Sequence, residues 1–477
     1  MTRNNIKTEV VEPNLGNFTA SLRDLGYSFE VAVADLIDNS ITAKASSIQI
    51  YCVAQPTIAF CLLDNGVGMS ENELVEAMRM ATKNPNDKRA KDDLGRFGLG
   101  LKTASFSQCR KLTVLSKKQG VLAVRQWDLD YIAEMNAWLL ITPEQYSNLP
   151  LINELNELEN GTLVCWEYID RISGKELSSA IDRMRKHLAL VFHKFLEGRT
   201  MFSPLKVSIN NTPVVPFNPF NINHPATQQA ASEKIVLFGS TVLVQPYILP
   251  HHSKISQQEY ELYATEEGYI KSQGFYLYRA NRILIYGTWW GLHKSIDAHK
   301  LVRIKIDIPN NLDSYWGIDI KKSVAQPCEE IKKDLKRIID QVTEKGARPF
   351  TGRGRKIEDK SIVQFWEIQP VNEDFRFAIN HDHPLYKDLL KNLNHETLEN
   401  LNFYLKGLQA YLPLEAIQSK LQKNPHQIKQ QAALSEPEIF EITQRLLASG
   451  LTEEYINDLL KTEIFINRKD LLKNGCK

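Results

Sequence analysis

The chain has 477 residues, of which 43% are hydrophobic and 24% are charged, and its formal net charge at pH 7 is +1. This length accommodates roughly two to four globular domains, and the balanced charge excludes a protein-wide basic field that would draw the chain to nucleic acid. The six cysteines include no C-x-x-C pair and lie mostly in apolar runs, which favours free thiols in a reducing compartment over a disulfide framework or a zinc site.

The N-terminal residues lack the apolar core of a signal peptide, and no apolar run approaches the length of a membrane span. We therefore expect a cytoplasmic protein with no membrane partner. His381 and His383 in NHDHP have a spacing that would suit a metal. Because no cysteine or further histidine lies nearby, a turn is the preferred interpretation and a metal site is the alternative.

The first part of the chain mixes helices and strands. Residues 21–44 have the period of one long helix, and the stretches SSIQIYC and TIAFCLL that follow alternate like strands. Ser70 precedes the helical pattern ENELVEAMRMAT, and Glu73 is placed to complete a capping box. The later stretch KNPNDKRAKDDLGRFGLG has no hydrophobic period and is interpreted as a mobile loop. LKTASFSQC then predicts a helix, the residues around Gln119 and Gly120 predict a hairpin, and GTLVCWEYI predicts one more strand.

These elements predict an α+β domain over residues 1–204, in which helices cover a largely hairpin-connected sheet as a two-layer α/β sandwich. A second unit, residues 205–347, contains the strand patterns STVLVQPYIL, GFYLYRANRILIYG and LVRIKIDIP and ends in the amphipathic helix CEEIKKDLKRIIDQVTEKGA. The Gly-rich basic stretch that follows is interpreted as a linker over residues 348–360. Residues 361–477 are expected to be helical, with breaks at Asn-Pro and His-Pro.

A polar face interrupts the apolar helix around ADLIDNS. At 3.6 residues per turn, Asp35, Asp38, Asn39 and Thr42 share one face, while the opposite face is apolar apart from Ser40. A solvated surface is one interpretation of the polar face, and half of a binding site is the other. Asn39 offers an oxygen ligand of the kind that Mg²⁺ takes, and Asp35, one turn earlier, can orient or deprotonate a water.

The stretch LLDNGVGMS places Asp64 at the end of an apolar strand, with Gly66 and Gly68 in the turn that follows. A buried carboxylate at that point can accept a hydrogen bond from an exocyclic amine, and glycines let a flat ring lie against the backbone. Turns favour these residue types in any case, so the motif alone has low specificity.

The stretch GRFGLGLKTAS opens a helix with Gly95, Gly98 and Gly100, so that backbone N–H groups can approach a phosphate, and Lys102 adds a cation. It is not a P-loop, because Leu101 separates the glycine from the lysine, and it lacks the third glycine of G-x-G-x-x-G. A glycine-rich helix entry without a ligand is the alternative. The acidic face, the strand-end carboxylate and this turn follow one another within about seventy residues, and together they predict a nucleotide site.

The stretches ADLIDNS, LLDNGVGMS, GRFGLGLKTAS and GTLVCW resemble the four ATP-binding motifs of the gyrase, heat-shock chaperone, histidine kinase and MutL (GHKL) superfamily. The sequence GLGLKTAS is typical of its microrchidia (MORC) branch. QGFYLYRANRILIYGTWWGL and SYWGIDIKKSVAQP resemble the transducer domain of prokaryotic MORC-like proteins. The resemblance implies a Bergerat ATP-binding fold followed by an S5-like α/β transducer domain and a helical C-terminal region.

The resemblance also implies a role for each matching residue. Asp35 would be the general base that activates water, Asn39 would bind Mg²⁺, and Asp64 would read the adenine amino group of ATP. Lys321 or Lys322 in DIKKS would reach the γ-phosphate, and a lid would span about Thr82 to Gly98. The remaining nucleotide contacts would come from Gly66, Gly68 and Met69 on the adenine and ribose side, from Gly98, Gly100, Lys102 and Thr103 at the triphosphate, and from Thr162 below Asp64.

The superfamily commonly has glutamate at the position of Asp35. The shorter aspartate reaches less far, and a misplacement near an ångström can lower a rate about a hundredfold. Glu30 projects to a different side of the helix and is a poor substitute. We therefore expect an ATPase that is slow or is stimulated by a partner.

Family members pair their N-terminal domains on binding ATP, so the resemblance implies a homodimer that acts as an ATP-gated clamp, with DNA as the expected partner. The stretches KGARPFTGRGRK and DRMRKH are candidate phosphate contacts or, equally, solvated surface. Prokaryotic MORC-like proteins are associated with restriction and phage-defence gene sets, which implies a nuclease or helicase partner.

A chaperone-like module that grips protein clients is the alternative function. It needs exposed apolar surface, which NFYLKGLQAYLPLEAI would supply, although a helix-bundle core is the interpretation we favour for that segment. A sensor histidine kinase is disfavoured, because no histidine precedes His187.

Overall fold

A computed structural model describes residues 9, 11, 13–55, 57–80, 94, 100–198, 204–265, 268–319, 322, 324–354, 362–371, 374–391, 393–423 and 434–473. The chain divides into two compact units, which are described separately. The first consists of Met1–Leu249, Thr265–Ser295 and Val302–Val342, and the second of Pro250–Ala264, Ile296–Leu301 and Thr343–Lys477.

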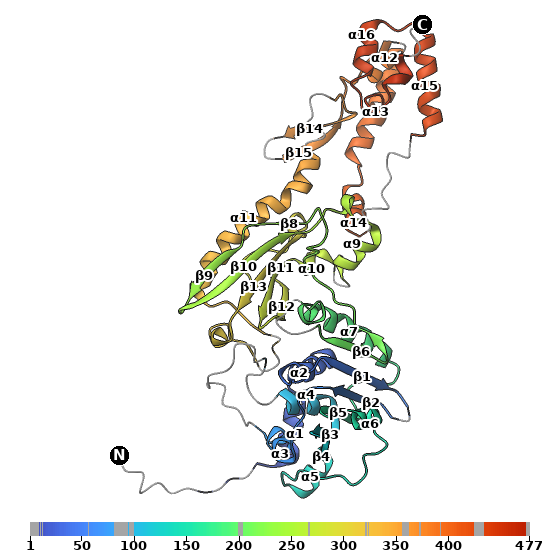
Figure 1. Ribbon diagram of the computed structural model, residues 1–477. Coiled ribbons are helices and arrows are strands. Elements are labelled where there is room, and N and C mark those ends of the chain that lie inside the picture. The colour runs from blue at the N-terminus through green and yellow to red at the C-terminus, as the bar shows by residue number, and fades with distance from the viewer. Residues whose placement is uncertain are drawn as a thin grey trace. The chain divides into compact units, whose positions relative to one another are not determined.

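The first unit opens with a seven-stranded sheet in the order β4-β3-β5-β2-β1-β6-β7 (Figure 1). Neighbouring strands are antiparallel except β1 and β6, which are parallel. This confirms the α+β class and the hairpin-connected sheet. The strands are β1 (Ser47–Val53), β2 (Ala59–Asp64), β3 (Cys109–Lys118), β4 (Val121–Asp128), β5 (Gly161–Ile169), β6 (Lys206–Ile209) and β7 (Thr212–Pro213).

Helices cover one face of this sheet and bury the main core, in which Phe29, Phe60 and Trp166 pack ring against ring. The other face has a smaller core around Leu63 and Leu163. Along β2 and β5 the side chains alternate between the two cores, as the period of a strand requires. These helices are α1 (Leu15–Arg23), α2 (Phe29–Thr42), α3 (Glu71–Met78), α4 (Gly100–Gln108), α5 (Leu129–Met135), α7 (Leu177–Val191) and α8 (His193–Leu196), whereas α6 (Ile152–Glu157) packs into the smaller core.

Two predictions for this region have different outcomes. The single helix over residues 21–44 is wrong, because α1 and α2 are separate and Gly26 between them has φ +73°, a left-handed conformation that ends a helix. The capped helix is confirmed, since Ser70 and Glu73 form both bonds of a capping box at the start of α3.

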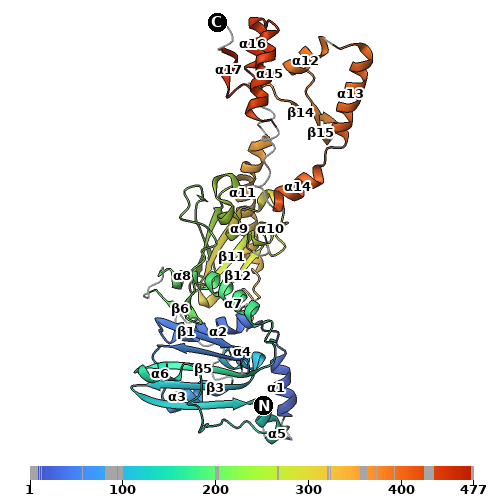
Figure 2. The ribbon, with the colours of Figure 1, turned by 90° about the vertical axis from the view of Figure 1, so that its right-hand side faces the viewer.

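The second sheet of the first unit has the order β12-β11-β13-β10-β8, with β9 paired to β10. Figure 2 shows β11 and β12 side by side in this sheet. The helix α11 (Glu329–Gly354) buries the apolar side chains of its first half, and it continues into the stretch expected to be a linker. The other elements are β8 (Gln228–Gln229), β9 (Glu233–Leu237), β10 (Ser240–Ile248), α10 (Tyr269–Ser272), β11 (Gly274–Arg279), β12 (Arg282–Thr288), β13 (Val302–Ile308) and η3 (Asn310–Leu312).

The second unit is not purely helical as expected, because β14 (Trp366–Val371) and β15 (Asp374–Ile379) form a two-stranded antiparallel sheet. Its core contains Ile439, Leu459, Phe465 and Leu472. None of the helices in the described part of the chain combines the length and apolar composition needed to cross a membrane. The remaining elements are η1 (His252–Lys254), α9 (Gln257–Ala264), η2 (Asp297–His299), α12 (Pro384–Lys391), α13 (His395–Ala410), α14 (Leu414–Lys423), α15 (Glu436–Ala448), α16 (Glu453–Leu459) and α17 (Lys469–Lys473).

Candidate functional site

The polar face of α2 is divided between the protein interior and solvent. Asp35 and Asp38 are each 2% exposed, whereas Asn39 is exposed. A solvated acidic surface is therefore the wrong interpretation for the two aspartates. Buried carboxylates need paired cations or hydrogen-bond donors, because desolvation of an isolated charge is costly.

The cations come from the second sheet and the loop that follows it. Lys322 Nζ donates to Asp35 Oδ1 at 3.0 Å and to Asp38 Oδ2 at 2.6 Å. Arg282, the first residue of β12, approaches the same two oxygens at 3.7 and 3.1 Å. Burial raises the pKa of Asp35 above its ordinary value, and the charges of Lys322 and Arg282 oppose that rise. Lys321 lies outside the described residues.

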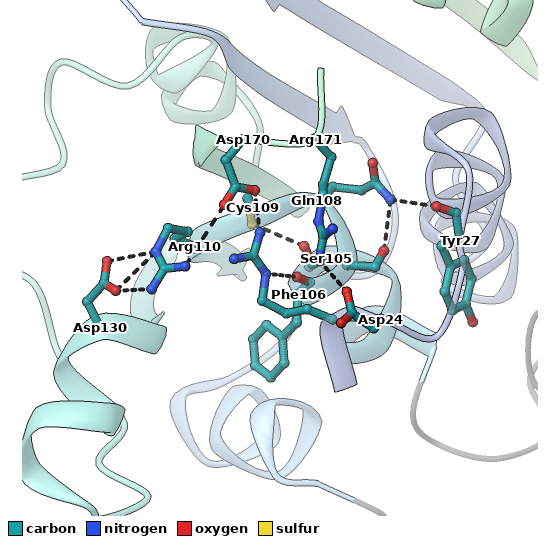
Figure 3. A network of polar contacts seen from close by, with 12 residues as sticks. Asp24, Tyr27, Ser105, Phe106, Gln108, Cys109, Arg110, Asp130, Asp170 and Arg171 are labelled. Atoms are coloured by element: carbon teal, nitrogen blue, oxygen red, sulfur yellow. Dashed lines mark hydrogen bonds and ion pairs between the residues drawn. The ribbon is translucent and has the colours of Figure 1, made fainter. Parts of the chain in front are cut away.

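The second carboxylate oxygen of Asp35 is also engaged. The hydroxyl of Tyr27 donates to Asp35 Oδ2 at 3.1 Å, and Thr103 on α4 forms a hydrogen bond with the Tyr27 side chain. The backbone of Tyr27 is held as well, because Gln108 Nε2 donates to its carbonyl at 3.2 Å (Figure 3). In the same network, Arg171 pairs with Asp24 at 2.6 Å. Tyr27 is thus held by contacts with α2 and α4.

Asp64 ends β2 as predicted, and the structure shows what holds its carboxylate. Ser40 Oγ donates to Asp64 Oδ2 at 2.8 Å, and the Gly66 N–H donates to Oδ1 at 2.8 Å. Burial raises the pKa of Asp64, while hydrogen bonds from Ser40, Gly66 and Thr162 oppose the rise. Ser40 was placed on the apolar side of the helix, so its contact with Asp64 was missed.

The predicted residues Met69 and Thr162 meet at Ser116. Thr162 on β5 lies opposite Asp64 on β2 and opposite Ser116 on β3. The Ser116 hydroxyl lies 2.8 Å from Thr162 Oγ1 and accepts a 2.8 Å hydrogen bond from the Met69 N–H. Sequence reasoning missed Ser116, which lies in an ordinary strand pattern without a motif.

The two turn glycines are required by close backbone approach. A Cβ on Gly66 would lie 2.8 Å from Ala43 Cβ at the end of α2. Gly68 has φ +64°, and a Cβ there would lie 1.9 Å from the Lys117 carbonyl oxygen on β3. These glycines therefore bring the turn against the helix and the sheet.

The N-terminus of α4 lies beside Asp35, because a Cβ built on Gly100 would be 3.8 Å from Asp35 Oδ2. Lys102 is buried and donates from Nζ to the Ala77 carbonyl at 2.9 Å. Desolvation lowers the pKa of Lys102 to about 8. Gly95 and Gly98 lie outside the described residues, as does the predicted lid apart from Leu94.

The polar groups gathered here fit a nucleotide that binds together with Mg²⁺. An acceptor carboxylate lies at the end of a central strand beside a glycine turn, and a helix N-terminus, a buried acid and a lysine lie together beyond it. Among the residues that the structure describes, no cluster of three or more His, Cys, Asp or Glu side chains is arranged to hold a metal. A site based on the Asn39 amide oxygen suits Mg²⁺, which keeps several waters and takes few protein ligands.

The fold and this arrangement define the class as an ATP-binding domain of the GHKL type. Residues 27–162 match the family of histidine kinase-, DNA gyrase B- and HSP90-like ATPases. The chain is also similar to "ATPase MORC2B" of Mus musculus, with 31% identity over 96 residues, which is 19% of this chain and 9% of that protein. It is 30% identical over 92 residues to "ATPase morc-1" of Caenorhabditis elegans, which is 19% of this chain and 10% of that protein.

Residues 27–162 thus form a GHKL-type domain, and the chain is MORC-like over the segment that the relatives match. The matched segment spans about a tenth of the length of these curated relatives.

Proposed function

We propose that this protein is a Mg²⁺-dependent ATPase in which Asp35 is the general base. The observation that carries the proposal is the contact between Asp35 and Lys322, which are 287 residues apart and belong to the ATP-binding domain and the transducer. A cation that reaches a buried acid from a second domain can respond to the charge of a bound triphosphate. Lys322 is therefore our choice for the γ-phosphate sensor.

The other roles follow the geometry. Asp64, with both oxygens oriented by Ser40 and Gly66, would accept the adenine amino hydrogen bond, with Gly66, Gly68, Met69 and Thr162 around the base. Gly98, Gly100, Lys102 and Thr103 would hold the phosphates, and Asn39 would bind Mg²⁺. When bound, the ion would neutralise phosphate charge. Both oxygens of Asp35 are engaged in this structure, which supports slow or partner-stimulated hydrolysis.

We further propose that ATP binding pairs two copies of the chain into a clamp, with DNA as the partner. The contact from Lys322 to Asp35 supports it, because a contact that changes with nucleotide can bias a dimer. Of the candidate patch on α7, Arg183 and Lys186 are exposed, whereas Arg185 donates to the Ile209, Thr212 and Pro213 carbonyls. A cytoplasmic role in prokaryotic restriction or phage defence, beside a nuclease or helicase, extends this proposal.

Sedimentation velocity of the full chain tests the clamp. Wild type and Asp35→Ala are compared with Mg²⁺ and ATP, with and without duplex DNA, and Glu134→Ala on α5 is the control for an exposed acid. We expect Asp35→Ala to trap a nucleotide-dependent dimer that retains DNA. A monomer under every nucleotide condition, or a dimer that never holds DNA at low salt, would refute the clamp.

A chaperone-like module is the second candidate, and one observation favours it. The segment NFYLKGLQAYLPLEAI does not form the helix-bundle core that we favoured, because Phe403 and Tyr411 are 82% and 87% exposed. An exposed apolar surface of this kind suits a protein client. ATP-dependent protection of an aggregating client without DNA, lost in Phe403→Ser, would support this function over the clamp.

A further inference from the structure

Two buried acids on α2 and two cations form a group of four residues joined by ion pairs. We call this group the ion quartet: Asp35, Asp38, Arg282 and Lys322. Each cation contacts both carboxylates, through Asp35 Oδ1 and Asp38 Oδ2. All four side chains are at least nine-tenths buried. Two positive and two negative charges therefore balance one another away from water.

The two cations are held differently. Arg282 begins β12 and pairs with Arg279 across a tight turn, so it is anchored in a six-stranded sheet, and its guanidinium lies 5.6 Å from the Phe192 ring centre. Lys322 lies in a loop and has φ +56°, a left-handed conformation that is strained for a residue with a side chain. The structure therefore makes Arg282 the stationary cation and Lys322 the one suited to move.

Within the quartet, Asp38 holds Lys322 more closely than Asp35 does, at 2.6 Å against 3.0 Å. The other Asp38 oxygen, Oδ1, is buried and has no hydrogen-bond partner among the described residues. Within the described residues, the polar contacts of the Asp38 carboxylate are with these two cations, so its charge acts on the cations rather than on the backbone around it. While Lys322 stays there, Asp35 Oδ1 is occupied by that lysine.

We propose that Asp38 is a resting-state anchor for Lys322, which restrains the ATPase until a nucleotide draws the lysine away. This inference rests on the proposed function, because it concerns the regulation of the same ATP site. Release of Lys322 leaves Arg282 as the remaining cation beside the two aspartates, and Asp35 Oδ1 loses its hydrogen bond from the lysine and becomes able to orient water. Only a fraction of the free protein is then in the state that binds the triphosphate, and the apparent affinity for ATP is lowered in proportion to that fraction.

The test is a double-mutant cycle on the full chain, using a fluorescent non-hydrolysable ATP analogue with Mg²⁺. Asp38→Asn keeps the shape of the side chain and removes its charge. We expect it to tighten analogue binding about tenfold when Lys322 is present and less than about twofold in a Lys322→Met background. Asp38→Glu, which keeps the charge, should bind the analogue more nearly as wild type does.

Weaker analogue binding by Asp38→Asn, or an equal change in both backgrounds, overturns the anchor while the proposed ATPase function stands. If wild type binds no analogue and hydrolyses no ATP, both the ATPase function and the anchor are refuted. Asp38→Ser is the second variant. Loss of folding in both neutral variants, seen as loss of the thermal unfolding transition, would show that Asp38 is structural and overturn the anchor as well.

Discussion

Arg279 at the end of β11 donates from Nη1 to the carbonyl oxygen of Leu94 at 3.1 Å, although the two residues are 185 positions apart. Arg279 Nε is at the same time bound by Asp313 at 2.8 Å, and both charged side chains are almost fully buried. Leu94 is 1% exposed and belongs to the core of the ATP-binding domain. An arginine of the second sheet therefore satisfies a backbone carbonyl in the core beside the first sheet.

Arg279→Met should lower the free energy of unfolding of the first unit by about 3–5 kcal/mol, because it removes the guanidinium that pairs with the buried Asp313 carboxylate. Urea unfolding followed by tryptophan fluorescence measures this loss. Arg337→Met is the control, since Arg337 pairs with Glu233 at the surface, and its stability should stay close to wild type. An equally small effect of both substitutions would contradict the structural role of Arg279.

Gly68→Ala should destabilise the first unit by more than about 3 kcal/mol, through left-handed strain together with the clash at Lys117. Gly120→Ala is a matched control, because Gly120 has φ +77° but its added Cβ would meet no atom within 4 Å. That control should lose only the strain, about 1–2 kcal/mol. If urea unfolding shows the same loss for both, the close approach of Gly68 to β3 is refuted.

The contribution of Lys102 to stability should rise with pH between about 8 and 10.5, because its lowered pKa lets the folded chain release a proton that the unfolded chain keeps. The rise should be absent below about pH 8. Lys194 has a pKa lowered to about 8 as well, so Lys102→Met and Lys194→Met should each remove part of the rise. Only Lys102→Met should weaken binding of an ATP analogue. A stability profile that neither substitution changes would contradict the burial of both lysines.

Arg282→Gln should lower kcat about tenfold or more and change the Kd of a non-hydrolysable analogue less than about twofold, because Arg282 contacts Asp35 and Asp38 rather than the nucleotide. Arg282→Lys, which keeps the charge, should recover part of the loss. Steady-state hydrolysis and analogue titration measure the two effects. A parallel loss of kcat and analogue binding would assign Arg282 to folding or nucleotide binding instead.

Local patterns predicted the parts of the site that local geometry decides. Asp64 ends its strand and is followed by glycines whose positions the turn requires. Both features can be recognised from a few consecutive residues of the sequence. Ser40 was misplaced because a helical wheel separates two faces, whereas Ser40 lies at the border where α2 meets β2 and reaches Asp64. The break at Gly26 was hidden because helical periodicity continues on both sides of it.

Contacts between distant segments were out of reach of sequence patterns. Tyr27 lies in no motif, and Arg282 lies in a stretch quoted for the resemblance that gave it no role. Their contacts with Asp35 depend on how the second sheet and α2 pack. Lys322 was expected near the phosphates only from the resemblance, and its pairing with Asp38 was not foreseen. The hairpin β14–β15 was missed because a predominantly helical region surrounds it.

The decisive measurement is single-turnover hydrolysis of ATP with Mg²⁺ by wild type and Asp35→Asn, with bound nucleotide measured in the same samples. If Asp35 is the general base, Asp35→Asn should bind ATP within about threefold of wild type and hydrolyse it at least about a hundredfold more slowly. Asp64→Asn, altered at the adenine side, should lose binding instead. Hydrolysis by Asp35→Asn at the wild-type rate would contradict the assignment of the base, and the absence of ATP binding by wild type would contradict the ATPase itself.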